Sequence, residues 1–461
     1  MTSRSTILRA IAVLLCLLFF MIPLSAEESE EKKPPTPPSM AEAEAAYLYH
    51  LSLEMPVFAK NETSVLPAGS SVKVLAGLIL CEELGDRTIE TVSVTKEMLA
   101  DAAGYRLDLK GGEVLTVEQL LYAAICGSYN DAFCVLACFL DGSVSAFAER
   151  MNRRATELGA TQSLFTEPCG TDDTSKTSAV DQFLIARAAH QNALYMQICG
   201  AAKYSLPNDL NLKVSVIRNR NSLISSITTT QYYNGNCNGM SAGGTDKGGN
   251  CVLTSATIGG EDFLCIVLGG ADIEDQNYGY IVTNRMLDWI EDNYSLTKVL
   301  SPETEVGSIP VTLSALTADI EIRATETLSY FLPSHLELGK DITYSLRLKS
   351  GSLEAPVEEG TYVGYVAVMY GSKTLGTAEL YTTESAQRHG FIGSMKWLED
   401  LLSNRPIFAA IIFFVVVLVG WIVTEQVIRI RRRHKWDKYF SKKMALSQAE
   451  PKKKSQRKTK K

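Results

Sequence analysis

The chain has 461 residues, of which 46% are hydrophobic and 21% are charged, and its formal net charge is −7. This composition is that of a globular protein, and it excludes a fibrous or intrinsically disordered chain. The length suits about two or three domains, and the acidic balance argues against nucleic acid as the main partner.

The N-terminus has the order of a secretory signal peptide. Two arginines precede an apolar run over residues 10–24, and the small residues Ser25 and Ala26 follow it. We expect residues 1–26 to be cleaved off. The alternative is an uncleaved anchor, for which the apolar run is short. Residues 27–42 contain four closely spaced prolines, which cannot form a helix or a sheet, and therefore predict an extended spacer.

The longest globular stretch, residues 43–294, mixes helical with strand patterns. Small and apolar residues at helical spacing predict helices over 120–140 and 180–199. Residues 251–268 predict two strands around a turn at Gly259-Gly260. The pattern indicates an α/β domain that is large enough to bury its own core.

The character of the chain changes after this domain. Residues 303–385 alternate short apolar and polar stretches between turn residues, which predicts a small all-β domain. Residues 391–402 are amphipathic and are predicted to lie along the outer membrane surface. The uncharged run over 406–424 predicts a transmembrane helix, the alternative being a buried helix of a soluble domain. The remaining residues, 425–461, form a strongly basic tail.

The charges beside the predicted span indicate its orientation. From Arg429 onward there are 15 basic and 2 acidic residues, so the rest of the chain carries about −20. Lysine and arginine next to a span stay on the cytoplasmic side, and each gains about 1 kcal/mol near the anionic inner leaflet. We therefore predict a protein of the cell membrane with a single C-terminal span and with the domain of residues 43–294 on the extracytoplasmic side. The tail is explained by the membrane, and no nucleic-acid partner is expected.

Ten cysteines would suit a disulfide scaffold, but Cys16 lies in the predicted signal peptide. The spacing of the others gives no paired metal-ligand pattern, and the five histidines are scattered. Cys134 and Cys138 share one helix face, where cysteine acts as a small buried hydrophobe. We expect mostly free thiols, no structural metal and no cofactor. The sequence also allows one or two disulfides.

Two short motifs could carry chemistry. Ser70 and Lys73 stand three residues apart at the start of an apolar helix, which places both side chains on one face. A buried lysine with a lowered pKa can remove the proton of such a serine. Further on, the hydroxyl of Ser128 and the amide of Asn130 could pass a proton to a leaving amine and hold a substrate carbonyl. Each motif by itself has an alternative interpretation. Ser70 and Lys73 could belong to an ordinary helix start, and Ser128 and Asn130 to a polar loop between two helices.

Ser-x-x-Lys followed by Ser-x-Asn belongs to the signature of serine β-lactamases and penicillin-binding proteins. The surrounding sequence resembles the low-molecular-weight D-alanyl-D-alanine carboxypeptidases from about residue 43 to 385. Residues 120–132 resemble their helix with the Ser-x-Asn element. Residues 165–173 resemble their Asn-Pro-His-Gly-Leu-Asp segment, with Cys169 at the usual histidine, and 357–364 resemble their stalk domain. The resemblance implies a transpeptidase-like α/β sandwich of an antiparallel sheet with helices, followed by a small all-β domain.

The third motif departs from this family, which reads Gly-x-Lys-Thr-Gly-x-Thr and then Gly-x-Cys. Four matching residues fix the register: Gly243, Thr245, Gly249 and Cys251. Ser241 and Ala242 therefore replace the lysine and threonine that help to bind the terminal carboxylate of the substrate in the family. Losing charge-assisted bonds of about 1.5–3 kcal/mol each would lower kcat/KM by several powers of ten without compensation. Lys247, the one cation in this run, is predicted to lie past the strand.

The resemblance still implies a complete catalytic apparatus. It assigns nucleophile and proton-transfer roles to four residues: Ser70, Lys73, Ser128 and Asn130. It assigns substrate binding to four more: Ser241, Gly243, Gly244 and Thr245. The implied oxyanion hole uses the backbone N–H groups of Ser70 and Gly244, which do not depend on the altered side chains.

The sequence therefore predicts a serine-type D-Ala-D-Ala carboxypeptidase. Such an enzyme removes the terminal D-alanine from peptidoglycan stem peptides through an acyl-enzyme, and β-lactam antibiotics acylate it. The alternative is a catalytically impaired relative that binds peptidoglycan or a partner protein. A β-lactamase is less favoured, because Glu167, the glutamate available for deacylation, lies in the segment that resembles the carboxypeptidases.

Overall fold

The computed structural model describes residues 34–172, 174–207, 212–226, 229–314, 319–388, 390 and 405–447. The predicted signal peptide and the amphipathic segment 391–402 lie outside the described residues. The chain forms two compact units. The first contains the chain up to Leu300 with Thr327–Thr343 and Val368–Gly376, and the second contains the remainder.

A five-stranded antiparallel sheet lies at the centre of the first unit, with the strand order β2-β1-β11-β10-β9. Its strands are β1 (Ala45–His50), β2 (Met55–Lys60), β9 (Cys237–Thr245), β10 (Gly249–Ile258) and β11 (Glu261–Gly270). The predicted turn at Gly259-Gly260 connects β10 to β11. Because β9 is an edge strand, one side of its backbone remains available to a ligand.

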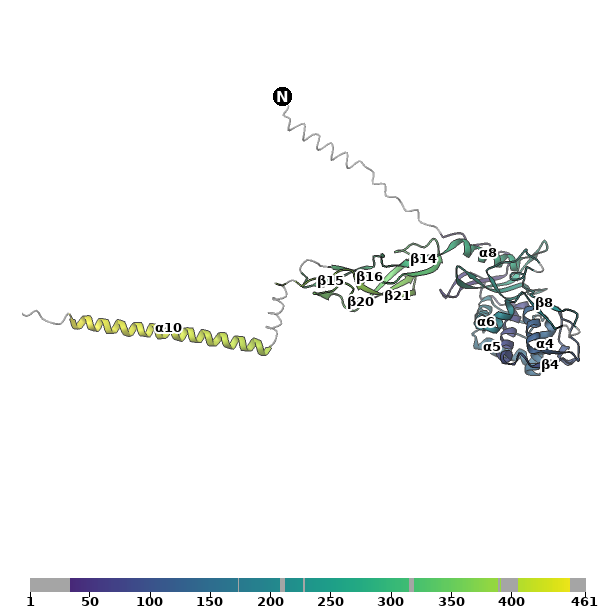
Figure 1. Ribbon diagram of the computed structural model, residues 1–461, viewed down its shortest axis with the longest axis horizontal. Helices are drawn as coiled ribbons and strands as arrows, with labels where there is room; N and C mark the ends of the chain where they lie inside the picture. The colour runs from purple at the N-terminus through teal and green to yellow at the C-terminus, as the bar shows by residue number, and fades with distance from the viewer. Residues whose placement is uncertain are drawn as a thin grey trace, which may run out of the picture. The chain divides into compact units, whose positions relative to one another are not determined.

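Helices cover both faces of this sheet (Figure 1). Successive side chains of a strand point to opposite faces, and β11 accordingly sends Leu264 and Ile266 into one core and Phe263 and Cys265 into the other. The first core contains most of the helices, and the second packs under α8. The predicted α/β sandwich is thereby confirmed. Its main helices are α2 (Val72–Leu84), α4 (Asn130–Asp141), α5 (Val144–Glu157), α6 (Ala179–Gln191), α7 (Ala193–Cys199) and α8 (Tyr278–Asn293).

The helices expected over 120–140 and 180–199 are both interrupted. The first divides into α3 (Val117–Leu121), the π-helical turn η4 (Tyr122–Cys126) and α4. Between them Ser128 has a φ of 59°, which is uncommon for a residue other than glycine and breaks the helix. The second is interrupted at Asn192, whose side chain caps α7 by accepting from the N–H of Tyr195. Apolar periodicity continues through both breaks, so the pattern alone did not reveal them.

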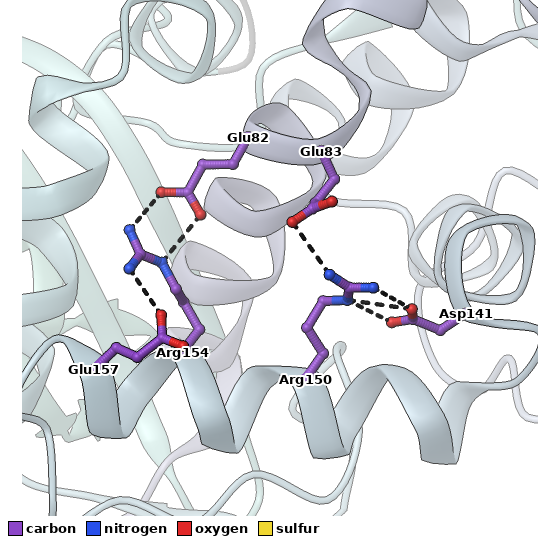
Figure 2. A network of polar contacts seen from close by, with 6 residues as sticks. All are labelled: Glu82, Glu83, Asp141, Arg150, Arg154 and Glu157. Carbon is purple, nitrogen blue, oxygen red and sulfur yellow. Dashed lines mark hydrogen bonds and ion pairs between the residues drawn. The ribbon is translucent and has the colours of Figure 1, made fainter.

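Two arginines on α5 tie this helix to its neighbours (Figure 2). Arg154 reaches Glu82 on α2 at 2.7 Å and Glu157 at 3.1 Å. Arg150 reaches Glu83 on α2 at 3.1 Å and Asp141 at the end of α4 at 2.6 Å. Exposed ion pairs contribute little singly, but forked pairs with shared partners restrict geometry. The network therefore helps to hold α2, the helix that follows Ser70, in place.

The remaining elements of the first unit are short. They are β3 (Leu66–Pro67), η1 (Gly69–Ser71), η2 (Gly85–Arg87), β4 (Thr91–Ser93), η3 (Glu97–Leu99), β5 (Val114–Thr116), β6 (Lys176–Thr177), β7 (Lys203–Ser205), β8 (Val216–Arg218), β12 (Asp272–Ile273) and β13 (Gln276–Asn277). The first unit also contains the antiparallel pair of β14 (Tyr294–Leu300) and β17 (Leu328–Pro333). Among all these, η1 and β8 matter most for the site.

A six-stranded sheet of order β18-β20-β21-β16-β15-β19 makes up most of the region between residues 303 and 385. Its strands are β15 (Gly307–Thr312), β16 (Asp319–Ala324), β18 (Ile342–Leu348), β19 (Leu353–Glu354), β20 (Tyr362–Tyr370) and β21 (Lys373–Thr382). This agrees with the predicted all-β character of the region.

Near the C-terminus, α10 runs over Arg405–Ser447. Within the described ranges it is the one unbroken helix long and apolar enough to cross a membrane, over Ile412–Ser441. The predicted span at 406–424 lies in α10, and the same helix continues into the first part of the basic tail.

Candidate active site

The nucleophile candidate stands where η1 passes into α2. Ser70 and Lys73 are both buried, with 6% and 8% of their surface exposed. The hydroxyl of Ser70 donates to the carbonyl of Gly243 on β9 at 2.7 Å. A Cβ at Gly243 would lie 3.0 Å from the Cβ of Ser70, so a side chain there would crowd the serine. The first motif thus meets the edge strand that carries the third.

The second motif closes the site from the helical side. Lys73 Nζ donates to the hydroxyl and to the carbonyl of Ser128, each at 2.8 Å. The positive φ of Ser128 brings both of these oxygens to the lysine. Asn130, the first residue of α4, donates from Nδ2 to the carbonyl of Ala103 at 2.6 Å. The structure therefore brings Lys73 and Ser128 into direct contact, and it directs the Ser70 hydroxyl to the Gly243 carbonyl.

The altered third motif lies against the same serine. The hydroxyl of Ser241 donates to the carbonyl of Ser70 over a long 3.4 Å, and Ala242 is buried in the core beneath α8. Thr245 Oγ1 accepts from the N–H of Gly248 at 3.0 Å, which fixes the turn between β9 and β10. Neither replacement side chain carries a charge, so this strand has no cation where the family has its lysine.

A cleft of about 1260 Å³ opens beside this strand, and Gly243 and Gly244 form part of its wall. Arg220 lines the cleft, with its guanidinium 4.1 Å from the ring centre of Tyr105. Tyr105 in turn stacks on Tyr129, the middle residue of the second motif, at 4.8 Å and 14°. Through its cation–π contact with Tyr105, Arg220 is a cation in the same cleft that Gly243 and Gly244 line.

Arg220 was not predicted from the sequence. It follows β8 in a segment without a recognised motif, and its backbone N–H donates to the carbonyl of Cys126 at 3.2 Å, a contact between distant parts of the chain. The available signal was a pair of arginines, Arg218 and Arg220, shortly before the third motif in an otherwise acidic domain. Lys247, considered as a substitute cation, also lines the cleft and lies in the turn after β9.

Glu167 has a structural part in this site. One of its carboxylate oxygens accepts from the N–H of Cys169 at 2.6 Å, and the other accepts from Thr171 and Asp172 at 2.7 and 3.2 Å. Both carboxylate oxygens are thus occupied by backbone donors, so Glu167 holds the turn of residues 167–172 in place. This structural role agrees with the expectation from the sequence that a β-lactamase is the less favoured function.

Comparison with known proteins identifies the family. Residues 32–272, more than half of the chain, match the family model described as D-alanyl-D-alanine carboxypeptidase. The chain belongs to this family. Residues 294–388 match the C-terminal domain of penicillin-binding protein 5, which accounts for the all-β region of this carboxypeptidase-family chain.

Relatives cover most of this carboxypeptidase-family chain at low identity. The D-alanyl-D-alanine carboxypeptidase DacF of Bacillus subtilis is 24% identical over 358 residues, covering 77% of this chain and 88% of the relative. DacC of Escherichia coli is 25% identical, with coverage of 85% and 95%. The crystal structure of penicillin-binding protein 5 from Haemophilus influenzae matches with a TM-score of 0.53 at 21% identity, covering 77% of this chain and all of that chain, and shows the shared fold.

The pKa of Lys73 is lowered to about 8, mainly by burial and also by the nearby Arg220, while Cys169 and Glu167 partly oppose the shift. The ordinary pKa of a lysine is about 10.4. Around neutral pH, a fraction of this amine is therefore unprotonated, which is the form that a general base needs.

We predict that acylation by a penicillin accelerates about tenfold per pH unit below pH 8, because only the neutral amine accepts a proton, and levels off above it. Stopped-flow or quenched labelling at saturating reagent from pH 6 to 9.5 measures the profile. A rate that is flat across this range would show that Lys73 is not the titrating base.

Proposed function

We propose that the chain is a serine-type D-Ala-D-Ala carboxypeptidase in which Ser70 is the nucleophile. Family membership supports the reaction, and one observation carries the assignment of residues: a buried lysine joins the serine-bearing turn to the Ser128 hydroxyl. Ser70 attacks the carbonyl of the penultimate D-alanine of a stem peptide. The terminal D-alanine leaves, and water then releases the acyl-enzyme.

The proposed proton route passes through Lys73. The neutral amine accepts the Ser70 proton during attack, and the 2.8 Å contact with the Ser128 hydroxyl gives that proton a path to the leaving amine. The backbone N–H groups of Ser70 and Gly244 are our candidates for the oxyanion hole. Asn130 is anchored through only one N–H of its amide, so the second can donate to the substrate backbone.

We assign carboxylate recognition to Arg220 in place of the missing lysine. Arg220 and the glycines of the third motif line one cleft, and the Tyr105–Tyr129 stack supports the guanidinium at the second motif. A planar guanidinium can bind a carboxylate through two parallel hydrogen bonds. This would allow a carboxypeptidase to work with Ser241 and Ala242, and it favours an active enzyme over an impaired relative.

The proposed setting is the outer face of a membrane. The uncharged run over 406–424 is followed in α10 by a cluster of arginines and lysines, which supports a span with a cytoplasmic tail. The catalytic unit would then face peptidoglycan stem peptides and β-lactam antibiotics on the extracytoplasmic side.

The full-length protein in detergent tests the function. We expect one covalent adduct per chain with a fluorescent penicillin, and release of D-alanine from an acylated tripeptide that ends in D-Ala-D-Ala. A peptide of the same sequence with a C-terminal amide is the control for carboxylate recognition. Peptide binding with neither adduct nor D-alanine release would instead identify a binding-only relative.

A further inference from the structure

Two thiols that the proposed mechanism does not use lie next to each other beneath the site. The sulfur atoms of Cys134 and Cys169 are 3.8 Å apart, and both residues are buried. Cys134 stands one helical turn after Asn130 on α4, and the sulfur of Cys169 also lies 3.5 Å from the carbonyl of Asn130. The pair therefore links the helix of the second motif to the loop that follows Glu167.

This loop packs directly against the nucleophile. A Cβ built on Gly170 would lie 1.9 Å from the carbonyl oxygen of Gly69 and 3.0 Å from the backbone nitrogen of Ser70. Only a glycine permits so close an approach, and Gly170 also has a φ of 73°. Because Gly170 packs on the backbone of Gly69 and Ser70, a movement of Cys169 should also move the backbone N–H of Ser70, which we place in the oxyanion hole.

We propose that Cys134 and Cys169 form an oxidative modification site, at which a peroxide converts the two thiols into a disulfide and so slows acylation of Ser70. The second half of this proposal rests on the proposed function. The first half concerns only the two sulfur atoms and stands without it.

The chemistry uses one peroxide for two thiols. The Cys169 thiolate attacks a peroxide oxygen, the O–O bond breaks, and the released hydroxide takes up the thiol proton as water. The thiolate of Cys134 then attacks the sulfur of the sulfenic acid. The S–O bond breaks and a second water leaves, so the sulfur pair has lost two electrons and the peroxide has gained them.

Cys169 is the thiol that would react first. It has 4% of its surface exposed against 1% for Cys134, and the ammonium of Lys73 favours its thiolate. A hydrogen bond with Cys134 and burial together raise the pKa of Cys169 well above its ordinary value. We therefore expect oxidation to be slow at neutral pH and faster in alkaline buffer.

Disulfide formation would distort the site. The S–S bond is about 2.05 Å long, so sulfur atoms now 3.8 Å apart must approach by about 1.8 Å. The Cys134 segment of α4 is embedded in the main core, whereas the loop at Cys169 is not part of a helix or strand. The loop should take up most of the movement, and a displacement of about 1 Å at a catalytic group can cost about 100-fold in rate.

The test uses the reduced full-length protein, treated with hydrogen peroxide and then with catalase. Peptide mass mapping should find a Cys134–Cys169 cross-link, and penicillin labelling should be slowed about 100-fold and restored by dithiothreitol. Cys134→Ala should keep its labelling rate after peroxide. The matched control is Cys138→Ala, which removes a more exposed thiol one turn further along α4 and should respond like the wild type.

Three results would overturn the proposal: no cross-link between these two cysteines, a cross-link without a change in labelling rate, or an equal loss in Cys134→Ala. If Cys134→Ala does not fold, Cys134→Ser serves the same comparison. Reduced protein that never labels would instead refute the proposed function, and mass mapping would still decide whether the disulfide forms.

Discussion

Replacing Ser70 by alanine is expected to abolish the covalent penicillin adduct and to lower kcat for D-alanine release by roughly a million-fold, as loss of the serine does in other serine hydrolases. The acyl-enzyme requires a bond from this hydroxyl, and neither Lys73 nor Ser128 can replace it at the same position. KM should change far less, because the hydroxyl contributes little to binding of the substrate. Gel fluorescence and a coupled D-alanine assay measure both quantities.

The matched control is Ser71→Ala, which removes the neighbouring hydroxyl. Ser71 donates to the carbonyl of Ala68 at 2.5 Å and is fully buried, so it supports the turn and does not face the substrate. This variant should still form the adduct. An adduct that persists in Ser70→Ala but disappears in Ser71→Ala would identify Ser71 as the nucleophile and contradict the assignment of Ser70.

Local sequence was enough to predict the elements that carry the three motifs. Ser-x-x-Lys places Ser70 and Lys73 on one helical face by geometry alone, and glycine spacing fixed the register of the third motif on a strand. The strands around Gly259-Gly260 were found for the same reason: alternation has a period of two and the turn residues are unambiguous. These features depend on local sequence, and the structure has a helix that begins just after Ser70, a strand that carries the third motif and a turn at Gly259-Gly260.

Features that depend on distant parts of the chain were not predictable. The helix break at Ser128 leaves apolar periodicity intact, so the positive φ that turns this residue toward Lys73 has no local signature. Arg220 became a candidate only through its contact with Tyr105, which precedes it by more than a hundred residues. The contact between Cys134 and Cys169 is likewise tertiary, and one of these cysteines was noted only for its position on a helix face.

Arg220→Ala should lower kcat/KM for peptides with a free C-terminal carboxylate by about 100- to 10,000-fold. The guanidinium can form two charge-assisted hydrogen bonds of about 1.5–3 kcal/mol each, and about 1.4 kcal/mol corresponds to a factor of ten. Because Arg220 also lowers the pKa of Lys73, the comparison belongs at pH 9, where the amine is largely neutral in the wild type. Arg218→Ala, at another arginine of the same cleft, is the control and should cost less than about tenfold.

Restoring the family's third motif gives a sharper test of the same assignment. If Arg220 compensates for the missing lysine, then Ser241→Lys with Ala242→Thr should raise kcat/KM by less than about tenfold in the wild type. In the Arg220→Ala background the same pair should recover most of the loss, since two cations that serve one carboxylate are not additive. The amide-terminated peptide should respond weakly to every one of these changes. Additive effects of the restored motif and of Arg220→Ala would mean that the two positions act on different groups, and carboxylate recognition would then have to be sought elsewhere in the cleft.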